Sequence, residues 1–471
     1  MKTSSPSLLW RWASAGVLAV AVAVAAATVE LTSGASARAT EAQACEPSAA
    51  SPAAIGNAVT DWNLIAQNAI TTPPPQGAPP RPIGSSVVHE GIVQAAIYDA
   101  TVAIEGGYQP FVTSPSVTRP ASTAAAIATA ACLVLVDHVP DQASSVEAQY
   151  DAYLAAIPDG SAKDNGITVG AQVGDAIVDW RSGDGLNSDP NWHQPPPGPG
   201  VFQPFPAGTK PVDIRLAEVT PLTLTSNDQF RPDGPNALTG GEYAEDFNEV
   251  KAYGRVDSAV RTPEQTQTAL FWSDNTARQW PRAERALALA EGLGLADSAR
   301  MLALAQVATA DALLACFDGK YHYLFWRPVY AIRRADTDGN AATEADLAWA
   351  PLLNVNHPEY PGAHGCGTTA VTKALAAFFD KDKVTFSVES AVTGTTRSYE
   401  RFRDSAKEVY DARTWAGLHF RNSTMEGARI GKKVARYVVA NFFQPVRKDV
   451  ARAALSSNVK NGASARRKEG R

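Results

Sequence analysis

The sequence has little cysteine, methionine or charge. Four cysteines and three methionines occur in 471 residues, and only 19% of the residues are charged. The cysteines are too few and too widely spaced for a disulfide-rich scaffold or for a clustered zinc site. They are Cys45, Cys132, Cys316 and Cys366. A disulfide can form between them, but the spacing assigns no pairing.

Basic surface is also scarce. The formal net charge is −6 and the isoelectric point is near 5.7. No basic face predicts nucleic-acid binding, and no basic amphipathic stretch predicts attachment to a membrane surface. We therefore expect partners that are small molecules, with any functional positive charge confined to a local site.

Apart from one run near the N-terminus, no segment is long and apolar enough to cross a bilayer. That run extends from about Ala13 to Val29, after Lys2 and Arg11, and small residues suited to cleavage follow at 35–37. This order is typical of an export signal. We expect a mature chain that starts near Arg38, has no membrane span and is secreted, either periplasmic or extracellular. An uncleaved anchor is the alternative.

Sustained alternation of apolar and polar residues, the pattern of a half-buried strand, is absent. Ala-rich segments with helical spacing dominate instead. They are Val87–Ile104, Ala121–Asp137, Val146–Ile157, Ile167–Arg181, Gln265–Asn275, Arg282–Leu293, Ser298–Phe317, Gly365–Phe379, Ser398–Leu418 and Met425–Phe443. We predict an all-α fold of two helical bundles whose facing ends enclose a site, with no more strand than a minor hairpin or two.

Composition divides the chain into parts. Pro- and Gly-rich segments at 72–82 and 190–206 are typical of surface loops, and the polar end GASARRKEGR is typical of disorder. The predicted parts are a secretion signal at 1–37, an N-terminal helical part at 38–190, connecting loops and helices at 191–297, a C-terminal part with the chemistry at 298–446 and a disordered basic tail at 447–471.

Cations and imidazoles gather in three short segments of the C-terminal part. In KYHYLFWRP, Lys320 and Arg327 are seven residues apart, so on a helix they share one face. In ARTWAGLH, Arg413 and His419 are six residues apart, so either Arg413 bends back or a helix begins between them. Cations lying along an apolar helix and a core histidine are the structural alternatives.

The third segment, HPEYPGAH, covers residues 357–364 and precedes a predicted helix. Gly362 permits close approach of the main chain, and backbone N–H groups at a helix start can hold an anion beside His364. A histidine with a purely structural role in a loop is the alternative. Together the three segments offer more positive charge and more donors than a structural carboxylate needs, which favours a tetrahedral or trigonal-bipyramidal oxyanion.

The three motifs Lys-x6-Arg-Pro, Pro-x-x-His and Arg-x5-His occur in this order. They resemble the signature shared by vanadium-dependent haloperoxidases and type 2 phosphatidic acid phosphatases. Upstream, VHEGIVQAAIYDA, GITVGAQVGDAIVDWRSGDG and ALFWSDN are also similar to exported bacterial haloperoxidase-like proteins. The residues that carry the signature are Lys320, Arg327, Pro328, Pro361, His364, Arg413 and His419.

The resemblance implies a role for each residue. Lys320, Arg327 and Arg413 would neutralise the oxygens of bound vanadate or phosphate. His419 would bond to vanadium or phosphorus, and His364 would be the acid–base group. Backbone N–H groups at Gly362 and Ala363 would complete the oxyanion site.

The sequence departs from the signature at residues around these motifs. The usual Pro-Ser-Gly-His reads Pro-Gly-Ala-His here, so that Gly362 supplies no hydroxyl donor. Ala412 stands where a serine is usual, and Ser423 where an aspartate is usual. No carboxylate is therefore assigned to orient His419, and either Asp411 or Glu426 substitutes for it or activity is reduced.

The resemblance leaves three functions open. The first is a haloperoxidase with vanadate as a non-redox cofactor, which uses hydrogen peroxide to oxidise bromide or iodide to a hypohalous species. The second is an acid phosphatase that needs no cofactor and hydrolyses phosphate monoesters through a phosphohistidine at His419. The third is an inactive oxyanion-binding protein. His357, a histidine in bromoperoxidase-like members, favours the first and is predicted to tune halide choice.

Overall fold

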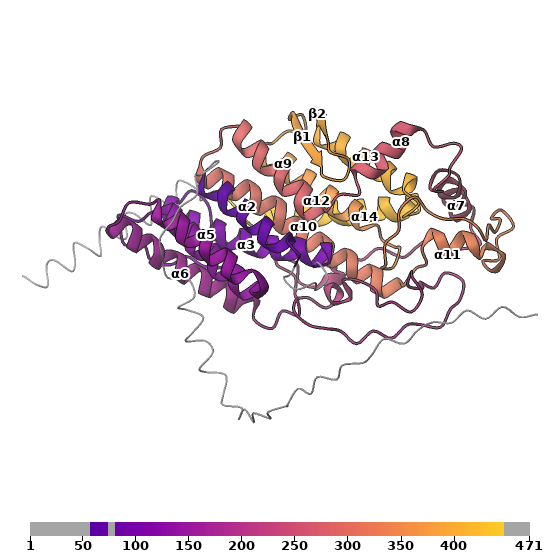
Figure 1. Ribbon diagram of the computed structural model, residues 1–471, viewed down its shortest axis with the longest axis horizontal. Helices are drawn as coiled ribbons and strands as arrows, with labels where there is room; N and C mark the ends of the chain where they lie inside the picture. The colour runs from indigo at the N-terminus through magenta and orange to yellow at the C-terminus, as the bar shows by residue number, and fades with distance from the viewer. Residues whose placement is uncertain (1–56, 74–80, 447–471) are drawn as a thin grey trace, which may run out of the picture. The chain divides into compact units, whose positions relative to one another are not determined.

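The structure is a computed structural model, and it describes residues 57–73 and 81–446. The predicted export signal, the basic tail and Cys45 lie outside these residues. The regular structure of the described chain is mostly helical (Figure 1), with a single hairpin of two antiparallel strands, β1 (Phe386–Ser390) and β2 (Thr395–Tyr399). The predicted all-α fold is confirmed, and the strand content stays within the predicted limit.

The α-helices of the described chain differ widely in length. They are α2 (Ala58–Thr71), α3 (Ile83–Glu105), α4 (Thr123–His138), α5 (Ala143–Ala155), α6 (Ser161–Arg181), α7 (Gly241–Tyr253), α8 (Pro263–Phe271), α9 (Thr276–Ala290), α10 (Leu295–Tyr323), α11 (Pro328–Arg333), α12 (Ala363–Phe378), α13 (Phe402–Trp415) and α14 (Arg421–Asn441).

The helices form two bundles that share α10. Helices α2 to α6 pack together in the first bundle, and α12, α13 and α14 pack together in the second (Figure 1). Helix α10 packs against α3 on one side and against α12 and α14 on the other. Contrary to the sequence-based expectation, it is long and apolar enough to cross a membrane, but 94% of its most apolar window is buried inside the protein. Its apolar residues therefore form a core common to both bundles.

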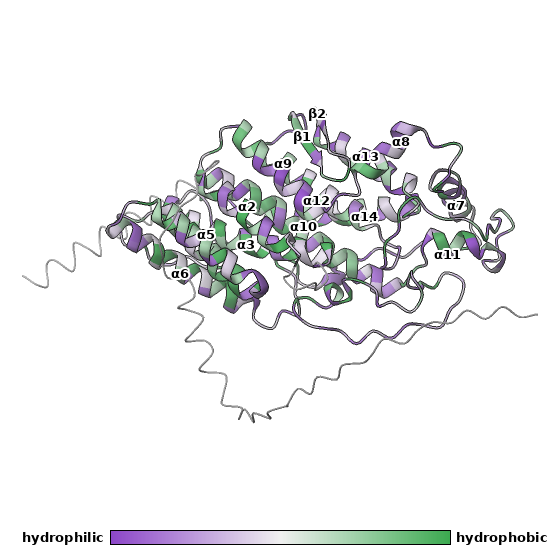
Figure 2. Ribbon diagram, in the orientation of Figure 1, coloured by the Kyte–Doolittle hydropathy of each residue, from purple (hydrophilic) through white to green (hydrophobic). Residues whose placement is uncertain are grey.

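The outer helices are amphipathic, as expected for helices that contact the core on one side. Helices α5 and α6 carry both hydrophobic and hydrophilic residues (Figure 2), and in α6 the buried positions include Val169, Val173 and Ile177 at helical spacing. Helix α3 differs, because nearly every one of its residues is buried between α2, α4 and α10. Its start, which carries Pro82 as the N-cap, reaches the second bundle at the candidate site.

Helices α12 and α14 approach each other through glycines. A Cβ on Gly365 would lie 2.3 Å from the Thr424 carbonyl oxygen, and one on Gly427 would lie 2.2 Å from the Gly362 oxygen. A Cβ on Gly431 would meet the Cys366 oxygen at 2.2 Å. These glycine contacts, called here the glycine seam, bring the two backbones together at the end where the predicted site residues lie.

Several predicted element boundaries are wrong. The helix predicted over Ser398–Leu418 begins only at Phe402, because the preceding residues form β2. Helix α10 ends at Tyr323, where Leu324 takes a left-handed conformation with φ of 50°. Lys320 and Arg327 therefore do not share a helix, and helix α13 ends, rather than begins, between Arg413 and His419.

Candidate functional site

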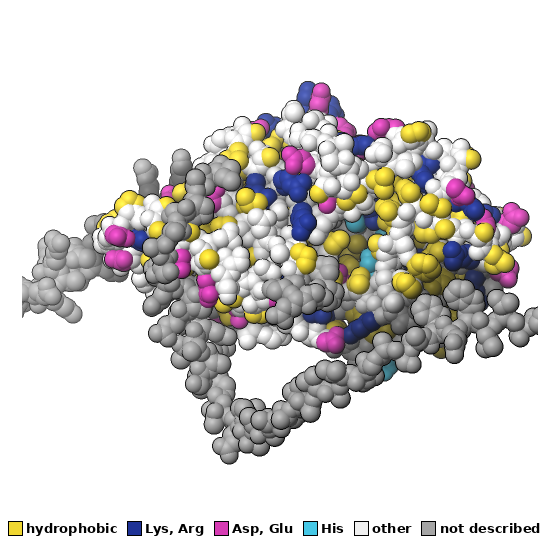
Figure 3. All heavy atoms as spheres, viewed as in Figure 1, with side chains coloured by type: hydrophobic (Ala, Val, Ile, Leu, Met, Phe, Trp, Pro, Cys, Tyr) yellow, Lys and Arg dark blue, Asp and Glu magenta, His cyan; other side chains and the backbone are white. Residues whose placement is uncertain are grey.

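A cavity of about 330 Å³ lies where the two bundles meet. Residues of two of the three motif segments, HPEYPGAH and ARTWAGLH, line it, together with the start of α3 and the loop around Val212, whereas Lys320 and Arg327 of the other segment do not. Figure 3 shows histidine side chains in a hollow of the visible face, framed by hydrophobic side chains. The sequence-predicted residues on the cavity wall are His357, Ala363, His364, Arg413 and His419.

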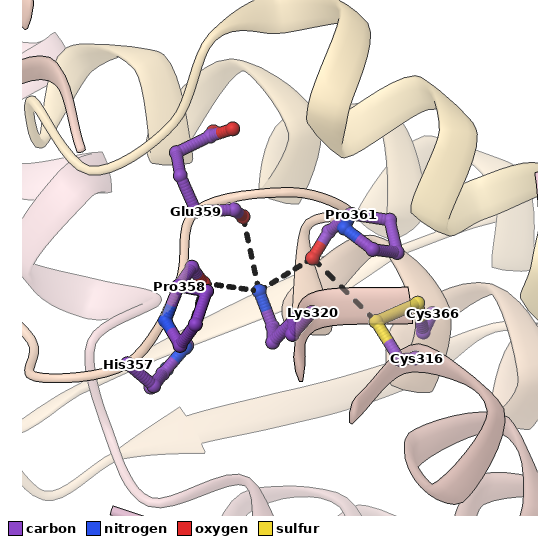
Figure 4. Close-up of a disulfide and its surroundings, with 7 residues drawn as sticks. All are labelled: Cys316, Lys320, His357, Pro358, Glu359, Pro361 and Cys366. Atoms are coloured by element: carbon purple, nitrogen blue, oxygen red, sulfur yellow. Dashed lines mark hydrogen bonds between the residues drawn. A yellow bond between two sulfur atoms is a disulfide. The ribbon is translucent and has the colours of Figure 1, made fainter. Parts of the chain in front are cut away.

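Lys320 lies behind this wall, in the last turn of α10. Its ammonium is fully buried and donates to the backbone carbonyls of Pro358, Glu359 and Pro361 (Figure 4). All three N–H donors of the ammonium are thus engaged by one loop. Lys320 fixes the fold of the residues that precede α12. Direct contact between Lys320 and an oxyanion requires exchange of one of these bonds and stays a prediction.

Arg327 connects two of the three motif segments. It is the N-cap of α11, and its Nε donates to the His357 carbonyl at 2.7 Å. Its Nη1 donates to the Leu418 carbonyl at 2.9 Å and lies 3.4 Å from Nε2 of His419. The guanidinium therefore holds the loop at 357 against the segment that ends in His419.

Arg413 and His364 leave donors open at the cavity. Arg413 is 3% exposed and donates through Nη1 to the Trp272 carbonyl at 3.0 Å. Within the described residues, neither Nε of Arg413 nor Nε2 of His364 has a hydrogen-bond partner. Helix α12 also begins here, at Ala363, and the first N–H groups of a helix have no partner inside it. These groups converge on one wall and are suited to an anion.

His419 is oriented by a buried carboxylate. Its Nδ1 hydrogen-bonds to Oε1 of Glu359 at 2.8 Å, and both side chains are almost fully buried. The same Oε1 accepts the N–H of Phe420 at 3.0 Å, and Oε2 accepts the hydroxyl of Ser423. Because Nδ1 faces the carboxylate, the lone pair of the ring lies on Nε2, and bonding of Nε2 to an electrophilic centre would replace its long contact of 3.4 Å with Arg327.

Glu359 was missed at the sequence level, and both substitutes named there are wrong. Asp411 pairs with Arg421 at 2.8 Å, and Glu426 pairs with Arg429. Glu359 reaches His419 from the segment HPEYPGAH. Ser423, at the position where the motif usually has aspartate, donates its hydroxyl to Glu359. The available signal was the acidic residue inside HPEYPGAH, between the two histidines.

The packing of α14 explains why position 362 is a glycine. A Cβ at this position would lie 2.9 Å from Cα of Thr424. The Gly362 N–H, which was predicted to complete the oxyanion site, instead donates to the Ser423 carbonyl at 2.7 Å. The close approach of α14 therefore excludes the serine that is usual here. The hydroxyl donor is thus missing because the two helices approach each other closely at the glycine seam.

His357 packs at the cavity wall beside Phe317, with ring centroids 5.3 Å apart. Its Nδ1 lies 2.8 Å from Nη2 of Arg327, close enough for a hydrogen bond. Burial, and then the charges of Arg327 and Lys320, lower the pKa of His357 well below its usual range. A positive charge on this ring is thus disfavoured, and its predicted effect on halide choice stays a prediction.

The site concentrates positive charge in a buried place. Burial lowers the pKa of Lys320 well below its usual range, that of Arg327 to about 10 and that of Arg413 to about 9. For Lys320 and Arg413, repulsion from Arg327 adds to the effect of burial. The opposing charge is Glu359, whose pKa burial raises to about 7. Three cations facing one carboxylate leave an excess of positive charge that an anion would relieve.

A disulfide fastens the site from behind. Cys316, one turn before Lys320 in α10, is bonded to Cys366 near the start of α12 (Figure 4). The sulfur of Cys316 also lies 3.6 Å from the Pro361 carbonyl oxygen. Both cysteines are fully buried. The bond joins the helix that ends in Lys320 to the helix that presents His364.

The donor set fits a vanadate or phosphate group. The unpartnered Nε of Arg413 and the first N–H groups of α12 suit its oxygens, and Nε2 of His419 suits vanadium or phosphorus in place of its long contact with Arg327. Within the described residues no cluster of histidine, cysteine and carboxylate side chains could hold a bare metal ion.

The motif-bearing bundle is similar to a known protein domain. The family description "VCPO second helical-bundle domain" matches residues 300–448, which contain all three motif segments. The match supports the superfamily of vanadium-dependent haloperoxidases and type 2 phosphatidic acid phosphatases, which the three motifs resemble.

The relatives within the superfamily are vanadium haloperoxidases. The vanadium chloroperoxidase of Curvularia inaequalis is 28% identical over 198 residues, which are 35% of this chain and 32% of that protein. The match thus spans about a third of the length of that curated relative. A bacterial vanadium-dependent iodoperoxidase has a similar structure, with a TM-score of 0.67, 20% identity and coverage of 85% of this chain and 100% of that one.

A bacterial vanadium-dependent chloroperoxidase in its holo form is also similar, with a TM-score of 0.64 and 16% identity. The likeness covers 80% of this chain and 95% of that one. At these identities the two structures establish a shared fold. This likeness of fold covers the first bundle as well as the motif-bearing bundle.

Proposed function

We propose that this protein is a vanadate-dependent haloperoxidase that oxidises bromide or iodide with hydrogen peroxide. The observation that carries the proposal is His419 on the wall of a cationic cavity, with Nδ1 held by Glu359 at 2.8 Å and with only a long contact of 3.4 Å from Arg327 at Nε2. The relatives found by sequence and by structure are vanadium haloperoxidases, which favours this function over the phosphatase alternative.

Each side chain has a defined part in this proposal. His419 would hold vanadate through Nε2, and Arg413 with the first N–H groups of α12 would hold its oxygens. Bound there, vanadate would act as a non-redox Lewis acid on hydrogen peroxide. His364 would move the proton, since its Nε2 faces the cavity without a partner among the described residues.

The protonation state of His364 supports this part. Burial, and then the charge of Arg413, lower the pKa of His364 well below its usual range. The ring is therefore neutral while the cavity holds only cations, and it can accept a proton from an incoming peroxide. A bound anion would raise the pKa of His364 again, because it offsets the neighbouring positive charge.

The direct test is a pair of assays on purified protein. Bromination of phenol red with orthovanadate and hydrogen peroxide should be detected and should depend on both additions. Hydrolysis of p-nitrophenyl phosphate without them should be negligible. Phosphatase turnover without bromination would assign the alternative function, and a bound oxyanion with neither activity would show an inactive binding protein.

Localisation belongs to the same proposal. The sequence predicts export, and a protein that releases an oxidant is best placed outside the cytoplasm. Mass spectrometry of the N-terminus of the protein recovered from the medium or periplasm should find a chain that starts near Arg38.

A further inference from the structure

The cavity is larger than the oxyanion it would hold. Its volume is about 330 Å³. A four-oxygen anion takes about 120 Å³ if each oxygen is given the roughly 30 Å³ share of a water molecule. About 200 Å³ remain, whereas an apolar cavity of about 150 Å³ admits benzene. A halide ion and a peroxide do not need so much space.

The remaining wall is apolar. Leu313 and Phe317 of α10 line it, together with Val355 from the loop before HPEYPGAH. Two further aliphatic side chains, Ile83 and Val212, also line it and are 42% and 39% exposed. Exposed large aliphatic groups beside a cavity favour an apolar ligand, because ligand binding removes their surface from water.

The apolar wall carries one open hydroxyl. Thr276, the first residue of α9, lines the cavity, and no hydrogen bond of its side chain is seen within the described chain. The other polar groups on that side are engaged. Asp213 accepts from the N–H groups of Gly84 and Ser85 at 3.0 and 3.1 Å, and Asn356 donates to the hydroxyl of Thr209 at 2.9 Å.

We propose that the cavity binds a phenol-sized aromatic substrate beside the oxyanion, with its ring against Phe317 and Val355 and its hydroxyl at Thr276, and that halogen transfer occurs there. This rests on the proposed function. Bromide gives two electrons to the O–O bond of hydrogen peroxide, and a C–Br bond replaces a ring C–H bond. The balance is Ar–H + Br⁻ + H₂O₂ + H⁺ → Ar–Br + 2 H₂O.

Binding is measured first without turnover. Titration calorimetry of phenol into the full-length protein with orthovanadate and no peroxide should show saturable binding at one site. Val212→Phe fills the cavity and should weaken binding by about tenfold, the order expected when an apolar pocket loses a good fit. Val256→Phe is the matched control, since Val256 is 52% exposed and lies outside the cavity lining. Absence of saturable binding to the native protein would overturn the proposal.

Selectivity is measured second. The ratio of ortho- to para-bromophenol from the enzyme should differ from that given by hypobromous acid in the same buffer, and Val212→Phe should shift it while Val256→Phe should not. Each bromination rate is divided by the same variant's rate of triiodide formation without phenol. A ratio equal to that of hypobromous acid in every variant would show that the oxidant leaves before it reacts, contrary to the proposal.

The two measurements separate this inference from the proposed function. Lack of triiodide formation with saturable phenol binding would contradict haloperoxidase activity and leave an aromatic-binding cavity. Triiodide formation without phenol binding would support the activity and refute the cavity assignment. Thr276→Val, which removes the hydroxyl at nearly constant volume, should weaken phenol binding but not the binding of toluene.

Discussion

At the scale of single residues, the carboxylate of Glu359 is the feature that adapts this chain to its missing aspartate. Glu359→Gln keeps the size of the side chain but removes the charge that faces Nδ1 of His419 at 2.8 Å. We expect vanadate affinity to fall by about 10- to 100-fold. Asp411→Asn is the control, because Asp411 pairs with Arg421. Calorimetric titration with orthovanadate checks both, and equal losses would return the role to Asp411.

Substitutions of His419 and His364 should differ in their effects on vanadate binding and on turnover. His419→Ala removes the proposed ligand nitrogen and should abolish both vanadate binding and bromination. His364→Ala should leave binding nearly intact and lower the turnover rate by about 10²- to 10⁴-fold, the usual contribution of an acid–base group. Titration with orthovanadate and initial rates distinguish the two. Equal loss of affinity in both variants would contradict the division of roles.

At the scale of elements, the glycine seam sets the distance between α12 and α14. Gly427→Ala adds a Cβ 2.2 Å from the Gly362 carbonyl oxygen, so the helices must separate. We expect a loss of about 1–3 kcal/mol in the free energy of unfolding, as for overpacked cores, and weaker vanadate binding. Gly241→Ala, with no heavy atom within 4 Å of the added Cβ, is the control. Urea denaturation of both variants gives the comparison.

A buried polar cluster between α9 and α10 makes the free energy of unfolding depend on pH. Glu284 is 1% exposed and accepts from Gln306 at 2.8 Å, and burial raises its pKa to about 7. A carboxyl whose pKa is raised by folding favours the native state fully below its unfolded pKa of about 4.5, and this stability is lost as pH rises through about 7. Glu284→Gln removes that loss. Urea denaturation between pH 4.5 and 8 should show the variant gaining stability relative to the native protein, whereas a constant difference would contradict the assignment.

Element boundaries show where sequence patterns stop being informative. The pattern of apolar residues correctly predicted α3 and α10. Both helices are buried on nearly all sides and are therefore rich in apolar residues. The pattern missed α2 and α7 and extended α13 backwards over β2. Residues 395–399 have only one buried position, Tyr399, so their pairing with β1 depends on a neighbour that periodicity does not report.

At the scale of the whole molecule, motif order predicted that distant segments come together, but not how. The positions of Arg413, His364 and His419 on one cavity follow from two of the motifs read in the sequence, Pro-x-x-His and Arg-x5-His. The engagement of Lys320 by backbone carbonyls and the arrival of Glu359 at His419 depend on the loop between α11 and α12, which no spacing specifies. The first bundle's share of the wall also depends on tertiary packing.

The buried disulfide has a consequence for durability. An enzyme that produces hypohalous acid exposes its own sulfur atoms to attack, and thiols and thioethers are oxidised readily. Here Cys316 and Cys366 are already oxidised and enclosed, and Met301 is fully buried. Met425, 38% exposed, is the methionine that the described surface presents to solvent. Peptide mass spectrometry after prolonged turnover should find the added oxygen at Met425 first, and Met425→Leu should prolong the working life of the catalyst.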